Sequence, residues 1–377
     1  YVYAGYPEID NSNLLELDLT EAAKANRLEE TLQERLGKEM KFDVVIGNPP
    51  YQEKTEGTSD NPVYHLFIQE AYKLADKVCL ITPARFLFDA GKTPKLWNQQ
   101  MLTDPHLKVA YYEPDSSKVF PGAVEIKGGL AITYRDRHER KGPIGIFSPS
   151  TELRSILEKV RKISHSSLAD EILLQSKFNL EILLADYPNY SKIIGSNGKE
   201  RRLTTSIFSQ LDFFTIDKTS DEDILIMGLI NNIRVYRYIP SRYLEPNKGI
   251  KSYKVILPKS SGSGAFGEEL SAPMIGEPGL SFTQSFISIG HYQTLYEAES
   301  IVKYIKTKVA RALLGSLKVT QDNNRSTWKN VPKQDFKPGS DIDWSQSVSA
   351  IDQQLYKKYG LTSEEIAFIE ANVRPME

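Results

Sequence analysis

The chain has 377 residues, more than one ordinary domain holds, which predicts two or three domains. Hydrophobic residues make up 40% and charged residues 25% of it, as in globular proteins, and the sequence shows no apolar run near the ~18 residues of a membrane span and no secretory pattern. Its single cysteine, Cys79, excludes an intrachain disulfide framework and favours a cytoplasmic location, and the net charge of −2 does not by itself indicate a nucleic-acid partner.

Residues 1–145 alternate between expected strands and helices. The strands are expected at 14–17, 42–46, 78–81, 108–113 and 129–134, and the helices at 21–38 and 64–74. Such alternation predicts an α/β fold with a doubly wound sheet. The run Phe42–Ile46 is apolar and β-branched, which is typical of a strand buried on both faces of a parallel sheet.

After Gly142-Pro143 the character of the sequence changes. A helix is expected at 152–163, residues 170–300 hold short strands separated by Pro, Gly, Ser and Asn, and a second long helix is expected at 297–314. We therefore expect four parts. They are a sheet domain at 1–145, a helical connector at 146–170, a mixed α+β region at 171–335 and a helical tail at 336–377.

Charge is unevenly distributed along the second half of the chain. Residues 191–260 contain 12 Lys/Arg against 7 Asp/Glu, residues 301–333 contain 8 against 1, and residues 334–377 contain 4 against 8. A basic middle fits a surface that faces phosphates, although a solvated face beside an acidic tail accounts for the same counts. The candidate contacts are Arg234, Arg237, Lys303, Lys306 and Arg311.

The strongest motif follows the expected strand at 42–46. Gly47 follows the strand, and the chain turns through Asn48, Pro49, Pro50 and Tyr51. The C-terminal ends of strands form the ligand crevice of an open α/β sheet, and two prolines hold a rigid turn there because they fix φ. A plain strand-ending turn is the alternative interpretation of the same residues.

The four residues resemble motif IV of the amino-methyltransferases, and nearly the whole chain resembles the adenine-specific DNA methyltransferases of type II restriction–modification systems, including those fused to a nuclease. Residues 15–19 resemble motif III, whose acid, here Asp18, contacts the adenine amine of S-adenosylmethionine. Residues 77–87 resemble motif VI, and 119–132 resemble motifs VII and VIII, where Phe120 backs the flipped base or packs in the core. The later region resembles a target-recognition domain.

This resemblance implies a partial doubly wound, Rossmann-like methyltransferase sheet followed by a mixed α+β target-recognition domain. It implies site-specific transfer of a methyl group from S-adenosylmethionine to N6 of an adenine flipped out of duplex DNA. Asn48 and the Pro49 carbonyl would accept the two N–H groups of that amine, and Tyr51 would stack on the base. The alternatives are a DNA-binding specificity module without catalysis, or methylation of another amine or amide substrate.

One part of the family pattern is not found. The glycine-rich motif I should precede motif III, but residues 1–13 contain only Gly5. We therefore expect the donor site to be incomplete and the isolated chain to be inactive or slow. The expected partners are double-stranded DNA and either a missing N-terminal methyltransferase or nuclease portion or a restriction subunit.

Two further patterns have competing interpretations. Residues 262–267 fit G-x-G-x-x-G but are followed by prolines and Glu268, which favours a flexible loop over a nucleotide site. Pro114-Asp115 with Glu125 and Lys127 fits a metal-dependent nuclease pattern, but the methyltransferase motifs account for the same segment. With few, scattered histidines we expect no metal site.

Overall fold

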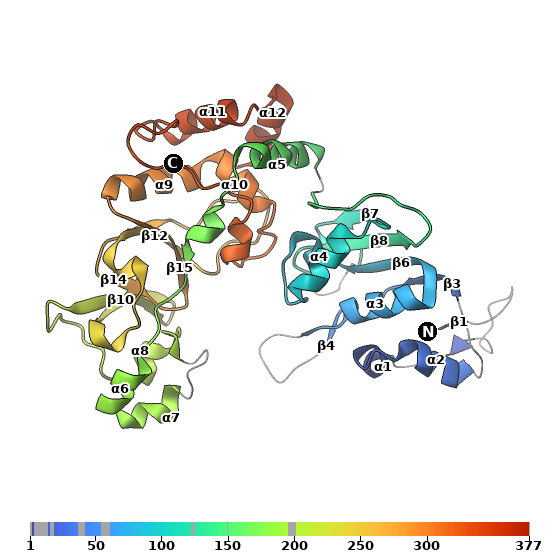
Figure 1. Cartoon of the computed structure of the whole chain (residues 1–377), viewed down its shortest axis with the longest axis horizontal. Coiled ribbons are helices and arrows are strands. Elements are labelled where there is room, and N and C mark those ends of the chain that lie inside the picture. The colour runs from blue at the N-terminus through green and yellow to red at the C-terminus, as the bar shows by residue number, and fades with distance from the viewer. Residues whose placement is uncertain are drawn as a thin grey trace. The chain divides into compact units, whose positions relative to one another are not determined.

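A computed structural model describes residues 2–3, 14–15, 19–36, 42–53, 61–121, 125–148, 150–194 and 201–376 of the chain. The chain divides into two compact units, Tyr1–Phe147 and Ser148–Glu377 (Figure 1). The division falls close to the boundary expected at residue 145. The expected recognition region and tail, with the connector beyond Phe147, lie together in the second unit.

The first unit is built on a four-stranded sheet in the order β3-β6-β8-β7. The strands are β3 Phe42–Gly47, β6 Ala75–Pro83, β8 Leu130–Asp136 and β7 Leu107–Glu113. β3 and β6 are parallel, as expected for the run at 42–46, whereas β8 runs antiparallel to both β6 and β7, so the sheet as a whole is mixed. The chain returns into β8 through Gly129, which has φ +74, and a Cβ there would lie 2.3 Å from the Glu113 carbonyl oxygen.

Four helices accompany this sheet, and two short antiparallel strand pairs complete the described part of the unit. The helices are α1 Thr20–Lys24, α2 Leu28–Leu36, α3 Tyr64–Leu74 and α4 Lys95–Thr103, and the strand pairs are β1 Val2–Tyr3 with β2 Leu14–Leu15 and β4 Gln52–Glu53 with β5 Asn61–Pro62. The helix expected at 21–38 is broken, because Asn26 takes φ +59. The buried carboxylate of Glu70 on α3 then accepts the Leu28 backbone N–H at 3.0 Å, which caps α2.

The two faces of the sheet differ in how far they are buried. Side chains alternate between the faces, and those at Val45, Val78 and Leu80 share the face against which α3 packs (Figure 1). On the opposite face Val44 is 42% and Ile46 is 78% exposed. Among the strands that the structure describes, β3 pairs only with β6, so the expectation of a strand buried on both faces is corrected for β3.

The second unit contains two further sheets. One has the order β11-β10-β14 and the other β13-β12-β15-β9. The strands are β9 Ile172–Leu173, β10 Asp223–Ile230, β11 Ile233–Pro240, β12 Tyr253–Pro258, β13 Met274–Gly276, β14 Leu280–Phe282 and β15 Phe286–Tyr292. β10 and β11 form an antiparallel ribbon whose base is buried between two apolar clusters, one containing Ile226 and Ile239 and the other Met227 and Phe286.

Helices lie at both ends of this unit, with the strands between them (Figure 1). The short helices at one end are α6 Leu180–Asp186, α7 Ser191–Ile194 and α8 Ile207–Gln210. The other end holds α5 Thr151–Ile163, α9 Leu295–Lys306, α10 Lys308–Gly315, α11 Val348–Lys358 and α12 Ser363–Asn372. Within the described ranges, none of the helices is both long and apolar enough to cross a membrane.

The single helix expected at 297–314 is two helices. Thr307 separates α9 from α10, and its hydroxyl accepts the Ala310 backbone N–H at 3.1 Å. The carboxylate of Asp352 on α11 accepts the next two orphan donors, the backbone N–H groups of Lys308 at 2.9 Å and Val309 at 3.0 Å. Thr307, next to the break, and Asp352, from another helix, therefore together cap the N-terminus of α10.

This cap gives the stability of the chain a pH dependence. Asp352 is 4% exposed, and burial raises its pKa to about 6, partly offset by the two N–H donors. The pKa of Asp352 is higher in the folded state than in the unfolded chain, where it is about 4. Its contribution to the unfolding free energy is therefore fully present below pH ~4 and is lost as the pH rises through 6. Relative to Asp352→Asn, which does not titrate, the wild type should lose up to about 3 kcal/mol of unfolding free energy between pH 4 and pH 7. Urea unfolding of both proteins at each pH measures this, and a difference that stays constant across that range would contradict it.

Candidate active site

The Asn48–Tyr51 turn begins where β3 ends. The β3–β6 register pairs Ile46 with Cys79 and Gly47 with Leu80, so Asn48 leaves at the C-terminal end of two parallel strands. Asn48 and Pro50 are exposed, whereas Pro49 and Tyr51 are half-buried. The turn therefore presents the Asn48 amide to solvent on a backbone that two prolines restrict.

Tyr51 is fixed to the protein behind the turn. Its carbonyl oxygen accepts the Val63 backbone N–H at 3.1 Å, just before α3 begins, and the next two residues pair with β5. Its hydroxyl is buried without a hydrogen-bond partner, and burial raises its pKa to about 12, so the phenol is neutral at physiological pH. This geometry leaves the ring available for apolar contact and excludes Tyr51 as a base near neutral pH.

Two further buried polar atoms lie on the elements that adjoin this turn. Thr82, at the end of β6, is 0% exposed, and its Oγ1 has no partner in the described structure. His65, on the first turn of α3, is 9% exposed with an unpartnered Nδ1, and burial lowers its pKa, so the ring is neutral. Unpaired buried polar atoms are uncommon, and each calls for an explanation, such as a catalytic role or an ordered water.

Sequence reasoning missed the importance of Thr82 and His65. Thr82 directly follows the apolar run that was expected as a strand at 78–81, and a polar residue at a strand's C-terminal end is the signal that could have found it. Around His65 the rings of Tyr64, Phe86 and Trp97 pack with centroids 5.2 to 6.4 Å apart, which ties α3 to the segment after β6. No pattern in the sequence brings these residues together.

Asp18 and Phe120 were also expected near this site. Asp18 lies outside the described residues. Phe120 is half-buried at the end of the turn after β7, where its backbone N–H donates to the Ser116 carbonyl at 2.9 Å. Whether Phe120 faces a base therefore stays a prediction.

The nuclease-like pattern nearby is occupied by local interactions. The Asp115 carboxylate accepts from the backbone N–H and hydroxyl of Ser117, and these bonds lower its pKa. Glu125 pairs with Lys127 at 2.9 Å. The described residues contain no group of three His, Cys, Asp or Glu side chains that could hold a metal ion.

The five basic residues expected to contact DNA fall into two groups. Arg234 is exposed and Arg237 half-buried on β11. Arg311 is 2% exposed, and its guanidinium donates to the carbonyl oxygens of Lys306, Glu268 and Arg374. The expectation that Arg311 contacts phosphate is therefore corrected, because its donors join three protein segments.

Lys303 and Lys306 are also engaged within the protein. The Lys303 ammonium donates to the carbonyl oxygens of Trp344 at 2.8 Å, Ser345 at 3.1 Å and Gln346 at 3.0 Å, which anchors the segment before α11. Lys306 is half-buried and has an interaction partner of its own. The basic residues of α9 and α10 thus hold the helical end of the unit together.

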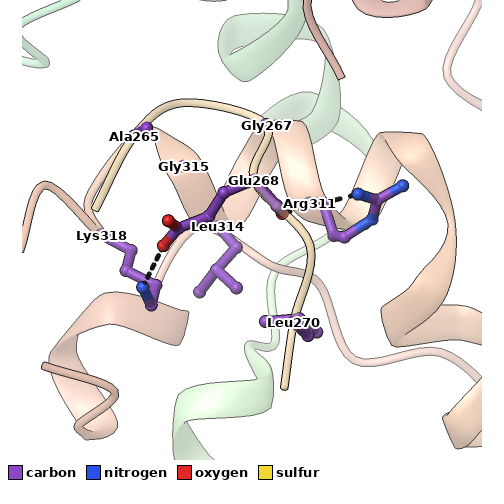
Figure 2. Close-up of a pocket in the computed structure, with 8 residues that line it drawn as sticks. All are labelled: Ala265, Gly267, Glu268, Leu270, Arg311, Leu314, Gly315 and Lys318. Atoms are coloured by element: carbon purple, nitrogen blue, oxygen red, sulfur yellow. Dashed lines mark hydrogen bonds and ion pairs between the residues drawn. The ribbon is translucent and has the colours of Figure 1, made fainter. Parts of the chain in front are cut away.

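The glycine-rich segment 262–267 is packed against the protein. The Glu268 carboxylate accepts the backbone N–H groups of Ser263 at 2.8 Å and Gly264 at 3.0 Å. It also pairs with the Lys318 ammonium at 2.6 Å (Figure 2). An internal carboxylate thus takes the position that a phosphate would take in a nucleotide loop. The flexible loop expected here is corrected, since a Cβ at Gly264 would lie 2.3 Å from the Thr320 nitrogen.

This arrangement predicts a specific loss of stability. Glu268→Gln leaves the 4% exposed Lys318 ammonium without its carboxylate and should lower the unfolding free energy by about 2–4 kcal/mol. The Glu269→Gln change alters the neighbouring carboxylate and serves as the matched control. Equal unfolding midpoints in urea for Glu268→Gln and the wild type would contradict this account.

Comparison with known proteins finds similarity over the segment that holds this turn. Residues 5–120 match the model of the Eco57I restriction-modification methylase family. An uncharacterized adenine-specific methylase of Mycoplasma pneumoniae (strain ATCC 29342 / M129 / Subtype 1) is 32% identical over 174 residues, covering 44% of this chain and 39% of that protein. The chain thus spans about two fifths of the length of that curated relative.

Two solved structures have a weaker likeness. One is the type IIL restriction-modification enzyme MmeI in complex with DNA, with a TM-score of 0.46 at 9% identity over 95% of this chain and 59% of that chain. The other is the type IIG restriction endonuclease BpuSI, with a TM-score of 0.31 at 10% identity over 93% of this chain and 51% of that chain. The sequence matches confirm the recognition made from the Asn48–Tyr51 motif: residues 5–120 match the Eco57I restriction-modification methylase family, and the chain is similar to an adenine-specific methylase.

Proposed function

We propose that the protein transfers a methyl group from S-adenosylmethionine to the N6 amine of an adenine that is flipped out of duplex DNA. The observation that carries this proposal is the exposed Asn48 amide on a proline-fixed turn, beside the half-buried Tyr51, at the C-terminal end of two parallel strands. The family match supports DNA methylation in a restriction–modification system.

The geometry of the turn suits an exocyclic amine. The N6 lone pair of adenine is delocalised into the ring, so the amine is a weak nucleophile. The Asn48 side-chain oxygen and the Pro49 carbonyl oxygen can each accept one N–H, which favours a pyramidal nitrogen with its lone pair free. Both oxygens also stabilise the positive charge that develops on the nitrogen as the new bond forms.

The donor supplies an electrophilic methyl group on a sulfonium. As the N–C bond forms the C–S bond breaks, and the amine then releases one proton to water. Asn48 orients the amine and does not take that proton, because an amide is not a base. Asp18, which we propose for the donor side, lies outside the described residues, so the residues of this structure account for the acceptor side of the reaction.

Tyr51 would hold the base once it leaves the duplex. A neutral ring beside the amide can stack on a purine, which is worth about 1–3 kcal/mol per base. The hydrogen bond from the Val63 backbone N–H to the Tyr51 carbonyl fixes the backbone that carries this ring. We propose Arg234 and Arg237 on β11 as phosphate contacts, and we keep Phe120 as a second wall of the base pocket.

Product analysis tests the proposed reaction. The full-length protein is incubated with duplex DNA and S-adenosylmethionine that carries a labelled methyl group, and the DNA is digested to nucleosides. The label is expected in N6-methyl-2′-deoxyadenosine. Label in a cytosine product or in protein glutamine would overturn the proposal, and duplex binding without any transfer would instead support a specificity module.

A further inference from the structure

The β10–β11 ribbon ends in a tip that the rest of the second unit leaves uncovered (Figure 1). At its base Ile226, Met227 and Ile239 are 0% exposed. At its tip residues 231–234 are all exposed, and Ile233 is 68% exposed. Burial therefore falls from complete to slight along one two-stranded ribbon, which anchors the base and presents the tip.

The tip is a tight turn with two asparagines. Ile230 pairs with Ile233, so only Asn231 and Asn232 lie between the strands, with φ +50 and +62. Left-handed backbone at both positions is the type I′ hairpin turn, which prefers Asn or Gly. Turn geometry accounts for the residue type, but it does not account for an exposed isoleucine beside two exposed amides.

The charge of the ribbon matches a nucleic acid. The ribbon contains two arginines and one carboxylate, Asp223, which lies at its base and accepts the backbone N–H groups of Thr219 and Ser220; residues 224–240 contain no carboxylate side chain. Arg234 contacts the Met274 sulfur and lies 5.8 Å from the Phe286 ring, and within the described residues neither it nor Arg237 is ion-paired. By contrast Arg242, two residues after β11, pairs with Asp186 at 2.8 Å.

We propose that this tip reads base pairs in the major groove of duplex DNA, an inference that rests on the proposed function. A two-stranded ribbon fits the major groove, where an asparagine amide pairs with adenine N6 and N7 and an apolar side chain contacts the thymine methyl group. Asn231 and Asn232 supply the amides, Ile233 supplies the apolar contact, and Arg234 and Arg237 hold the phosphates.

The test replaces the amides without disturbing the turn. The full-length protein is expressed in cells that lack adenine methylation, and sequencing of methylated adenines gives its recognition motif. Asn231→Gly with Asn232→Gly keeps the left-handed backbone, so the melting temperature should hold. At least one adenine–thymine position of the motif should relax, with discrimination there falling about tenfold or more. Ile233→Ser, outside the turn, is the second variant and should relax a neighbouring position.

The controls separate this inference from the proposed function. Asn26→Gly removes another exposed asparagine at positive φ, in the first unit, and should leave the motif unchanged. If the wild type methylates no adenine, the proposed function fails. If the wild type has a motif and both tip variants keep every position of it, or lose methylation uniformly at all sites, the base-reading role of the tip is overturned while the methyltransferase proposal stands.

Discussion

The Asn48→Ala variant of the full-length protein is expected to lose methyl transfer by about 10²–10³-fold in kcat while it keeps its affinity for duplex DNA. The substitution removes the side-chain acceptor for one N–H of the target amine, and the Pro49 carbonyl remains as the other. Asn48 is exposed, so the change should leave the melting temperature within about a degree. Single-turnover kinetics with labelled S-adenosylmethionine measure the chemical step separately from binding and release.

Two variants make the Asn48 result specific. Asp43→Ala changes an exposed residue near the other end of the same strand and should transfer methyl groups at the wild-type rate. Asn48→Asp restores an acceptor oxygen and should recover part of the lost rate. If Asn48→Ala lowers affinity for DNA and leaves the single-turnover rate intact, the amide binds DNA and does not activate the amine.

The second large effect concerns Arg311. Arg311→Leu should lower the unfolding free energy by about 3–5 kcal/mol, because three backbone carbonyls lose their donor in a site that is 2% exposed. The salt dependence of DNA binding, measured where the variant stays folded, should not change. Arg234→Gln should do the reverse, with little loss of stability and a salt slope reduced by about one.

The comparison of these two arginines distinguishes a structural cation from a DNA-binding one. Urea unfolding and fluorescence anisotropy at several salt concentrations give both quantities for each variant. If Arg311→Leu is as stable as the wild type and flattens the salt dependence, then Arg311 faces phosphate in the functional protein. That result would restore the sequence expectation that the structure corrects.

Local sequence patterns predicted the parts of the fold that local forces decide. The helix at Tyr64–Leu74 begins and ends where its apolar spacing indicated, and β3 ends where Gly47 meets Asn48 and two prolines. The candidate site was visible for the same reason, because its chemistry lies in four consecutive residues.

Elements that depend on distant partners could not be predicted in this way. The helix expected at 297–314 is divided at Thr307, and the acid that caps its second part, Asp352, comes from another helix. Arg311 looked like a surface cation because two of its partners, Glu268 and Arg374, lie far from it in sequence. The unpartnered atoms of His65 and Thr82 appear only when α3 and β6 are placed together.

The most direct test of the account is the structure of the full-length protein bound to duplex DNA and a non-reactive analogue of S-adenosylmethionine. We predict that one adenine leaves the helix and that its N6 lies about 3 Å from both the Asn48 side-chain oxygen and the Pro49 carbonyl oxygen, with its ring on Tyr51. An adenine that stays stacked in the duplex, or one held elsewhere with Asn48 still facing water, would contradict the assignment of this turn.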